Sequence, residues 1–433
     1  MNTWVSPIRR GWVVRDSVPG PDVDEFAEPD QVITALAQPG ATDGTLLAVQ
    51  HPHRTPAARA QGLDLRAALP IAHTALRELR ASHYRPVTDV VGLSWGKGPT
   101  GSALGLLCVV DPAAVNTDGR AWVRHTEEVY PDVVAERAAM LSGLGCATSA
   151  AMLVPVDGGE QFTRLLCDAV AQLGAPAVSL PDARLWLAGK GELQDRLIEA
   201  ACVQSLLVAD GNHRVAAAAE AGNGSLLALI TAGPALRIGP IHRVLVGTGL
   251  SLEDLAGRWR RIGLDVQPNH DRTPPQTPGT VVVVAGDAAL HVKLPGLDID
   301  HRQVENILIE QALGLDPAGP QVWPLPPGRP ARPDADAVLL IAPVPLADVL
   351  AVHAAGQRMP RKATYFTPKP RSGLLLAEIP SPPPVESGVD EIPGRRAGPG
   401  AGHAHASAGS TGRDDPAVRG GRDRQVGPRP AHP

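Results

Sequence analysis

The sequence predicts an α/β protein, of the mixed α+β kind, in which short apolar strands alternate with amphipathic helices. Its 433 residues are 43% hydrophobic and 20% charged, a composition typical of globular proteins long enough for more than one core. Apolar runs of strand length recur along the chain, and apolar residues repeat at helical spacing between them. Because the two patterns alternate up to about residue 379, strands and helices are expected to pack together in layers.

Strands are predicted where a short apolar run ends abruptly, as buried strands do. The runs of this kind are 12–14, 46–49, 90–93, 104–110, 206–208, 226–230, 240–246, 281–284, 290–294 and 338–341. The glycine-rich segment 94–103 lacks the spacing of a Walker A phosphate loop, so it favours a hairpin instead.

Helices are predicted where apolar residues recur three and four positions apart. These segments are 71–79, 133–141, 160–173, 192–201, 212–221, 252–262, 304–313 and 346–355. Ser251 and Asp254 resemble a capping box at the start of the segment 252–262. Gly222 suits the left-handed position after the helix that ends near Ala221.

The strongest local pattern is residues 209–215, where a short strand runs into a helix; we name this segment the phosphate turn. Asp210 is expected to cap the helix, and Gly211 permits the tight turn before it. The first turn of a helix presents free N–H groups and the positive end of the helix dipole, which together hold phosphate. His213 and Arg214 add side-chain donors at the same place. The same residues also suit an ordinary helix start with surface hydrogen bonds.

Other candidate site residues lie on either side of the phosphate turn. His125, Glu127 and Arg137 lie near the start of a predicted helix, where they suit a carboxylate or phosphate group. His242 and Arg243 form a second His-Arg pair at the start of a predicted strand. Taken singly, each of these residue types is more often a surface residue than a ligand-binding one.

A proline-rich loop near the N-terminus carries clustered carboxylates. Glu25 or Glu28 in this loop is a candidate general base for a substrate hydroxyl, although acidic loop residues are usually solvated.

Composition narrows the classes of partner. The net charge of −5 and the lack of a basic stripe argue against a dedicated nucleic-acid binder. No apolar run is long enough to cross a bilayer, and residues 1–15 lack the apolar core of a signal peptide, so a cytoplasmic protein is expected. The four cysteines lack Cys-x-x-Cys spacing and are expected to be buried free thiols. Residues 380–433 lose apolar periodicity and are expected to form a disordered tail.

The order of the motifs resembles one protein family. The motifs are Pro21–Val23, Arg124-His125 with Glu136-Arg137, Ala209–Arg214, Ile241–Arg243, Met359–Lys369 and Ser372–Leu374. In this order they resemble the bacterial and archaeal family called domain of unknown function 1015, over the chain up to Leu376. That family is distantly similar to the ParB/sulfiredoxin-like nucleotide-binding fold, which includes the free serine kinases. The resemblance implies that residues 1–379 form a nucleotide-binding core with additional helical and α/β lobes.

The resemblance also implies roles for individual residues. The phosphates of ATP or ADP would lie on Gly211, Asn212, His213 and Arg214. Asp210 would lie beside Mg²⁺ or cap the helix. The catalytic set expected is therefore Glu25, Glu28, Asp210 and His213, and the substrate-binding set is His125, Glu127, Arg137, His242 and Arg243.

The chain departs from the family pattern at four positions. Pro21 replaces an aromatic residue, Thr126 replaces a glutamate, Asn212 replaces the usual histidine and Ala363 replaces a common serine. Because asparagine still donates a hydrogen bond, the phosphate turn tolerates its change better than the acidic site tolerates Thr126.

Two functions follow as expectations. The first is a nucleotide-dependent kinase that phosphorylates a small hydroxy acid or a free amino acid such as serine, with positioned charges stabilising the transfer. The second is a nucleotide-binding regulatory protein without turnover. The expected partners are a nucleotide and a small-molecule substrate, and a homodimer is one assembly that the sequence leaves open.

Overall fold

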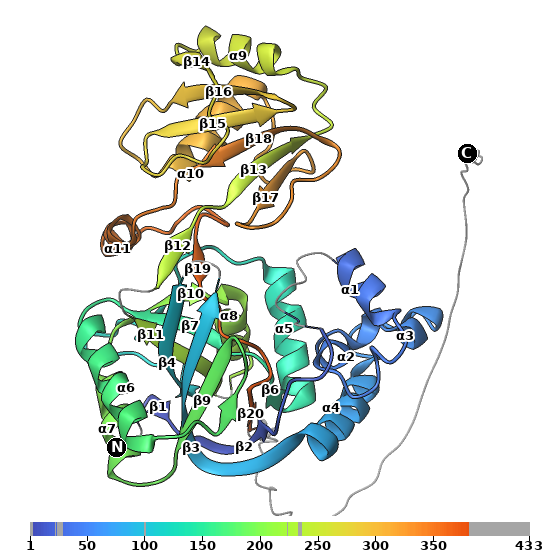
Figure 1. The fold of residues 1–433 in the computed structure, drawn as a ribbon, viewed down its shortest axis with the longest axis vertical. Helices are drawn as coiled ribbons and strands as arrows, with labels where there is room; N and C mark the ends of the chain where they lie inside the picture. The colour runs from blue at the N-terminus through green and yellow to red at the C-terminus, as the bar shows by residue number, and fades with distance from the viewer. Residues whose placement is uncertain are drawn as a thin grey trace, which may run out of the picture. The chain divides into compact units, whose positions relative to one another are not determined.

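The computed structural model describes residues 3–21, 23, 29–98, 101–222, 224–232 and 236–380. These residues all fall within one compact unit, Met1–Pro383. The predicted α/β class, mixed α+β, is confirmed, because helices alternate with strands and the larger sheet contains both parallel and antiparallel pairs (Figure 1). Glu25, Glu28 and residues 381–433 of the predicted tail lie outside the described residues.

The larger sheet contains twelve strands within the described part of the chain. They are β1 (Val5–Ser6), β2 (Ile8–Val14), β3 (Tyr84–Gly98), β4 (Gly101–Val110), β5 (Val123–Arg124), β6 (Cys146–Ala147), β7 (Ala151–Pro155), β8 (Val178–Ser179), β9 (Ala183–Ala188), β10 (Leu206–Asp210), β11 (Leu226–Ala232) and β20 (Leu375–Glu378). The main path through the sheet is β5-β10-β7-β11-β4-β3-β2-β20-β6. The pairs β5–β10 and β7–β11 are parallel, and β3–β4 is the hairpin that the sequence predicts.

A second sheet lies in the sequence between β11 and β20. Its order is β14 (Val266–Asn269), β16 (Ala288–Lys293), β15 (Thr280–Ala285), β18 (Ala335–Ile341), β13 (His242–Val246) and β17 (Val322–Leu325), and each of these strands is antiparallel to its neighbours. The sheet has its own apolar core around Trp259. Beside it, β12 (Arg237–Gly239) pairs with β19 (Tyr365–Thr367).

The helices of the described residues follow the predicted pattern closely. They are α1 (Pro29–Leu36), α2 (Leu46–Gln50), α3 (Pro56–Ala60), α4 (Leu69–His83), α5 (Pro131–Leu144), α6 (Gly159–Leu173), α7 (Glu192–Cys202), α8 (Asn212–Glu220), α9 (Leu252–Arg261), α10 (Asp300–Gln303) and α11 (Leu346–Ala354), with a 3₁₀ turn η2 (Pro52–Arg54) and a π-helix η3 (Val304–Gln311). The capping box of α9 forms, and Gly222 takes the left-handed φ of 66° after α8.

Helices cover both faces of the larger sheet. Successive side chains of β10 point to opposite faces of the sheet, and both faces are buried. Leu206 and Val208 pack in the core that contains α6 and α7. Leu207 and Ala209 pack on the other side, against Phe366. Helices α2 and α4 lie away from α6 and α7 in Figure 1 and bury their apolar residues in a separate core. Fully burying a leucine contributes about 2 kcal/mol, so the strand before the phosphate turn is held firmly.

Two small residues bring α5 and α8 close together. Ala217 of α8 packs against Val134 and Ala138 of α5 in a small apolar cluster. Arg137 precedes Ala138 on α5, so it lies at the rim of this contact. The close helix approach thus delivers a residue of α5 to the start of α8.

Three expectations are wrong. Residues 46–49 form helix α2 rather than a strand, because the Thr45 hydroxyl caps it and all four apolar residues are buried, so no periodicity shows. Asp210 does not cap α8, because Gly211 occupies the N-cap position and no side chain caps it. Cys167 is exposed, although Cys108 and Cys146 are buried.

No helix among the described residues is both long enough and apolar enough to span a bilayer.

Candidate functional site

The phosphate turn forms at a break in the larger sheet. The pairing of β10 with β7 slips between Val208 and Asp210, and Gly211 then adopts φ = 91° before α8 begins at Asn212. The backbone N–H groups of Asn212, His213 and Arg214 donate to no other described residue. The first turn of α8 therefore offers the open N–H groups and positive dipole end that bind an anion.

The Asp210 carboxylate is held by two cations at the end of β10. Lys369 Nζ lies 2.7 Å from Oδ1, and Arg214 Nη2 lies 2.5 Å from Oδ2. Burial raises the pKa of Asp210, but Lys369 and Arg214 outweigh burial and bring the pKa to about 2. For Lys369, burial lowers the pKa, but the ion pair with Asp210 outweighs it and the pKa is raised. Asp210 and Lys369 are therefore both charged at neutral pH.

Arg214 folds back over the turn that precedes it. Besides its ion pair, it donates to the carbonyl oxygen of Ala150 at 2.7 Å. A Cβ atom placed on Gly211 would lie 2.7 Å from Arg214 Nε, and φ = 91° is a region that L side chains rarely adopt. Glycine is thus required at this position for two independent reasons.

The Asn212 side chain points away from the open first turn, toward Thr126. Its Oδ1 accepts from Thr126 N and lies 3.2 Å from His125 Nδ1, while its Nδ2 donates to the Thr126 hydroxyl. That hydroxyl donates to the Val208 carbonyl oxygen at 2.7 Å. Burial lowers the pKa of His125. Asn212 and Thr126 therefore fasten β10 and α8 to the segment after β5, and Asn212 offers a ligand its backbone rather than its side chain.

His213 is a neutral side chain at the mouth of the turn. Its Nε2 accepts from Tyr130 N at 3.0 Å, and its ring stacks on the Tyr130 ring with centroids 5.7 Å apart. Burial first, then the charges of Lys362 and Arg137, lower its pKa to about 4. Because Nε2 is an acceptor, the proton of the neutral ring sits on Nδ1. That N–H has no hydrogen-bond partner among the described residues and is free to donate to a ligand.

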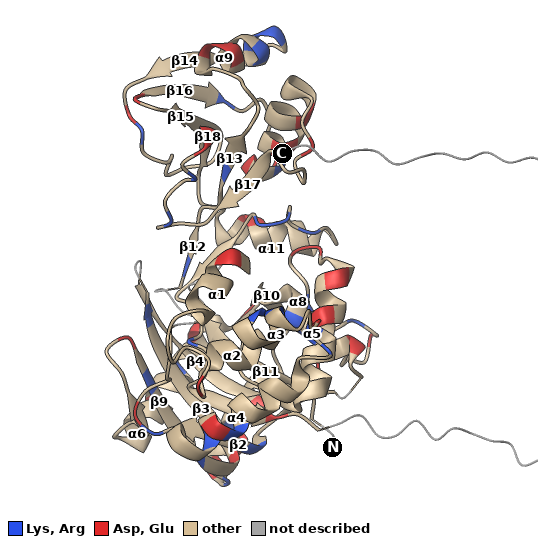
Figure 2. Cartoon of the chain, turned by 90° about the vertical axis from the view of Figure 1, so that its right-hand side faces the viewer, with Lys and Arg blue, Asp and Glu red and all other residues tan. Residues whose placement is uncertain are grey.

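Positive charge converges on the first turn of α8 from two other parts of the chain. Arg137 comes from α5, and Arg361 and Lys362 come from the segment after α11; all three lower the pKa of His213. Lys362 also acts on Asp210, beside Lys369 and Arg214. Blue segments lie at α8 and next to it in Figure 2. Asp210 neutralises part of this charge, Glu128 pairs with Arg361, and Glu127 and Glu136 lie near Lys362 and Arg137.

Glu127 fixes the segment that carries Lys362. Its carboxylate accepts from Lys362 N at 3.2 Å and from the Thr364 hydroxyl at 3.1 Å, and burial raises its pKa. Met359 N donates to the Thr126 carbonyl oxygen, which ties the same segment to the residues that follow β5. Lys362 has φ = 52°, an uncommon conformation for a residue other than glycine. Glu127 thus positions the segment that carries Lys362, and its predicted role as a substrate ligand stays a prediction.

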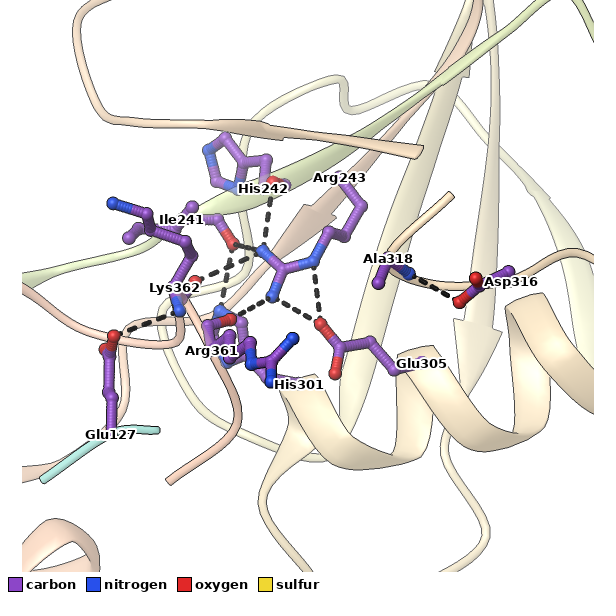
Figure 3. Close-up of polar contacts among 10 residues, drawn as sticks. All are labelled: Glu127, Ile241, His242, Arg243, His301, Glu305, Asp316, Ala318, Arg361 and Lys362. Atoms are coloured by element: carbon purple, nitrogen blue, oxygen red, sulfur yellow. Dashed lines mark hydrogen bonds and ion pairs between the residues drawn. The ribbon is translucent and has the colours of Figure 1, made fainter. Parts of the chain in front are cut away.

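The predicted pair His242 and Arg243 lies in β13, next to the same segment (Figure 3). Arg243 is 3% exposed, pairs with Glu305 of η3 at 2.7 Å, and donates to the carbonyl oxygens of Arg361 and Lys362. His242 Nδ1 accepts from Ile341 N, and burial lowers its pKa to about 4. Arg243 therefore supports the segment that carries Lys362, whereas His242 holds the neighbouring strand β18.

The residues around Asp210 do not fit a magnesium site. Magnesium requires several oxygen ligands in octahedral geometry. Each Asp210 oxygen already faces a cation, and the described residues contain no group of three His, Cys, Asp or Glu side chains that could hold a metal ion. The surroundings suit the phosphates of a nucleotide better than they suit a dication.

Two cavities border this basic surface. The smaller, about 80 Å³, lies between α5, α8, β6 and β11, and has Arg137 and Arg214 in its wall; we name it the α5–α8 cavity. The larger, about 930 Å³, is lined by residues that include Tyr130, Arg361 and Lys362; we name it the η3 cavity. The residues around the first turn of α8 therefore line two cavities, one small and one large.

The sequence patterns do not predict one group of residues near Arg137, formed by His51, His53 and Arg54. His51, His53 and Arg54 follow α2; burial, then Arg137 and Arg54, lower the pKa of His51 to about 3. His53 Nε2 lies 3.8 Å from Glu136 of α5. The run His-Pro-His-Arg is the available signal, but nothing in the sequence links it to α5. Lys362 and Lys369 belong to the motif Met359–Lys369, to which the sequence assigns no role.

Comparisons with known proteins give one family and several distant structures. No curated protein matches the chain. A free serine kinase in complex with AMP matches with a TM-score of 0.36 and 13% identity, covering 62% of this chain and 92% of that chain. A conserved hypothetical protein from Pyrococcus furiosus has a TM-score of 0.35 and 12% identity, covering 62% and 95%. Truncated SbnI from Staphylococcus aureus has 0.35 and 13%, covering 60% and 82%.

The family model described as protein of unknown function, DUF1015, matches residues 93–308. The match includes the phosphate turn, α5 and Arg243, whereas the motif Met359–Lys369 lies beyond it. Residues 93–308 of this chain thus belong to the DUF1015 family.

Proposed function

We propose that the protein binds ATP or ADP with its phosphates on the first turn of α8, and that it transfers a phosphoryl group to a small hydroxy acid. The observation that carries the proposal is the open first turn of α8, with Lys362, Arg137 and Arg214 around it and a free N–H on neutral His213. Phosphoryl transfer needs mainly positioned positive charge, which this arrangement supplies.

The transfer conserves atoms and charge in a simple way. The acceptor hydroxyl oxygen forms a bond to the terminal phosphorus, and the bond from that phosphorus to the bridging oxygen breaks. The nucleotide leaves with one phosphate fewer, and the hydroxyl proton passes to a general base. Glu25 or Glu28 stays the predicted base. In this proposal, Lys362 and the α8 amides stabilise the charge on the phosphates.

The η3 cavity suits the nucleoside. It borders Tyr130 and Lys362, which also surround His213, and its volume of about 930 Å³ exceeds what a nucleoside requires. The α5–α8 cavity, at about 80 Å³, is too small for a base and a sugar together.

A nucleotide-binding regulator without turnover is the second candidate, and one observation favours it. Asp210 is the acidic side chain of the turn, and both of its oxygens are neutralised by Lys369 and Arg214. An acidic group so engaged is unsuited to take a proton from a substrate.

The test uses the full chain with ATP or ADP, Mg²⁺ and a panel of hydroxy acids and hydroxy amino acids. Phosphorylated product is followed by ³¹P NMR, and nucleotide affinity by calorimetry. Lys362→Gln should weaken nucleotide binding by at least about 10-fold, because it removes a charge from the phosphates. Lys293→Gln, at an exposed position of β16, is the matched control and should change nothing.

The outcomes separate the two candidates. Nucleotide binding with product supports the kinase, and binding without product on any acceptor supports the regulator. If wild-type protein binds neither ATP nor ADP, or if Lys362→Gln and Lys293→Gln behave alike, the proposal is wrong.

A further inference from the structure

A basic cluster lies between the turn η2 and helix α5. His51, His53 and Arg54 lie in or beside η2, and Arg137 lies on α5; we name these four residues the η2 cluster. His53 Nε2 lies 3.8 Å from the Glu136 carboxylate of α5, so the turn and the helix are neighbours. Helices α2 and α3, on either side of η2, lie next to α5 in Figures 1 and 2.

His53 and Arg54 orient each other. Arg54 Nε donates to His53 Nε2 at 3.2 Å, so the proton of the neutral His53 ring sits on Nδ1. That Nδ1 atom is buried and has no hydrogen-bond partner among the described residues. The Nη1 and Nη2 groups of Arg54 likewise donate to no described residue. Because an unpaired buried donor is unfavourable and guanidinium groups bind phosphate well, the pair suits the oxygens of an anion.

The surroundings of His51 are positively charged. Burial first, then the charges of Arg137 and Arg54, lower the pKa of His51 to about 3. Two carboxylates act elsewhere in the cluster: Glu136 and Asp64. Neither of them forms an ion pair with Arg54 or Arg137 in the described part of the chain. Both guanidinium groups are therefore available to an anion that lies beside His51.

Arg137 connects the η2 cluster to the phosphate turn. Burial, then Lys362 and Arg137, lower the pKa of His213, and Arg137 also acts on His51. The Arg137 side chain is exposed, so a ligand can reach it from solvent. Lys362 lines the η3 cavity. Positive groups therefore succeed one another from the η3 cavity, past the first turn of α8, to Arg54. Such a succession suits a chain of phosphates better than a single one.

We propose that the phosphate chain of the nucleotide runs from the η3 cavity across the first turn of α8, and that Arg54 and Arg137 bind its terminal phosphate. The inference rests on the proposed function and gives the bound nucleotide a direction. The nucleoside lies at the Lys362 end, and the phosphoryl group that is transferred lies at the η2 cluster.

Arg54 is a catalytic residue in this arrangement. Its Nη groups donate to the non-bridging oxygens of the terminal phosphate while the acceptor oxygen bonds to the phosphorus and the bond to the bridging oxygen breaks. Arg54 stays protonated throughout, and the hydroxyl proton of the acceptor passes to the general base. The guanidinium thus stabilises the charge on the group in transfer.

A series of nucleotides tests this direction with the full chain. Affinities for AMP, ADP and ATP are measured by calorimetry at one concentration of Mg²⁺. The tighter of ADP and ATP should bind at least about 10-fold more tightly than AMP, because its terminal phosphate reaches the η2 cluster. Arg54→Gln should weaken that nucleotide by at least about 10-fold and leave AMP within about 2-fold. Lys362→Gln, at the nucleoside end, should weaken all three.

Matched variants make the comparison specific. Arg59→Gln, at an exposed position of the adjoining helix α3, is the control and should change none of the three affinities. Arg137→Gln removes no described hydrogen bond or ion pair and should reproduce the pattern of Arg54→Gln, so the test does not depend on one variant. Arg54→Lys keeps the charge without the planar fork and should recover part of the affinity. Retained AMP binding shows that each variant is folded.

The rate of transfer gives a second measurement. With saturating nucleotide and a hydroxy acid that yields product, Arg54→Gln should lower the rate by at least about 100-fold, and Arg59→Gln should not. An unchanged rate in Arg54→Gln overturns the catalytic role.

The failures are distinguishable. If ADP and ATP bind no more tightly than AMP, or if Arg54→Gln weakens all three nucleotides alike or none of them, the assignment of the terminal phosphate is overturned while nucleotide binding stands. Inorganic phosphate that binds together with saturating ADP or ATP, and is lost in Arg54→Gln, would make the η2 cluster a separate anion site and overturns the assignment too. A wild-type chain that binds none of the three nucleotides overturns the proposed function instead.

Discussion

Asp210 acts as an internal counter-ion at the scale of single residues. Its two oxygens neutralise Lys369 and Arg214, which would otherwise repel each other across the end of β10. An incoming phosphate competes with Asp210 for the same cations. The carboxylate therefore stabilises the fold at the expense of anion affinity.

Asp210→Asn should lower stability and preserve or strengthen nucleotide binding. Breaking the ion pairs of a partly buried carboxylate should cost about 2 kcal/mol, and the freed Lys369 and Arg214 become available to phosphate. Chemical denaturation and ADP calorimetry measure the two effects. Loss of ADP binding in folded Asp210→Asn protein would instead indicate that the carboxylate serves the ligand, as a metal ligand would.

His213 reports on the phosphate turn through its pKa. Its pKa of about 4 lies below that of an unfolded histidine, near 6.5, so its contribution to stability is complete above pH 6.5 and is lost as the pH falls toward 4. A bound phosphate favours the charged ring and should raise this pKa by at least about one unit. NMR titration of the His213 ring with and without ADP measures the change. An unaltered pKa in the presence of saturating ADP would place the phosphates elsewhere.

At the scale of elements, α8 is bounded by two glycines with positive φ. Gly211 starts it with φ = 91° and lies under the Arg214 guanidinium. Gly222 follows it with φ = 66°, and a methyl group added there would meet nothing within 4 Å. Both glycines adopt a positive φ, and only Gly211 also leaves room for the Arg214 side chain.

Gly211→Ala should therefore be more harmful than Gly222→Ala. Each should lose about 1 kcal/mol from left-handed strain, and Gly211→Ala should lose further stability and nucleotide affinity because Arg214 is displaced. Thermal unfolding and ADP calorimetry compare the two. Equal losses in both variants would show that the contact of the Arg214 guanidinium with Gly211 contributes neither to stability nor to nucleotide affinity.

At the scale of the whole described chain, Arg243 links the second sheet to the site. It lies in β13, pairs with Glu305 of η3, and holds the carbonyl oxygens of Arg361 and Lys362 (Figure 3). Lys362 in turn acts on His213 and Asp210. A buried side chain in one sheet thus fixes a cation beside a helix of the other.

Arg243→Met should destabilise the protein by about 3–5 kcal/mol, because it leaves Glu305 and the two carbonyl groups without a partner. It should also weaken ADP binding, because Lys362 is no longer held and because Arg243 lines the η3 cavity. Arg272→Gln, which removes a surface ion pair with Asp287, should stay within about 0.5 kcal/mol. Hydrogen exchange at residues 359–363 should accelerate in Arg243→Met alone; unchanged exchange there contradicts the linkage.

The sequence predicts structure well where one local pattern decides it. The strand, turn and helix around Gly211 follow from residues a few positions apart, and so do the capping box at Ser251 and the turn at Gly222. The prediction is wrong at α2, where five consecutive residues carry no helical periodicity. It is also wrong at Asp210, where a distant lysine decides what the carboxylate does.

The site residues divide in the same way, into those that a local motif predicts and those that only tertiary packing brings to the site. Arg137 and His213 are predicted from nearby motifs and lie together, whereas His51 and Lys362 reach them only through tertiary packing. Arg243 is predicted as a ligand-binding residue; the structure adds a supporting role, which the sequence does not reveal because Glu305, its ion-pair partner, is distant in the chain. Local chemistry can be read in the sequence, whereas partners far away in the chain cannot.

The position of β20 has a consequence for how the protein is made. This last strand, Leu375–Glu378, lies between β2 and β6, both formed from the first 147 residues. During synthesis from the N-terminus, the larger sheet must therefore keep an open edge until residue 378 leaves the ribosome. The second sheet, whose strands all lie within residues 242–341, is complete well before then. In a nascent chain stalled before residue 375, the six-stranded second sheet should be complete while the larger sheet still lacks β20.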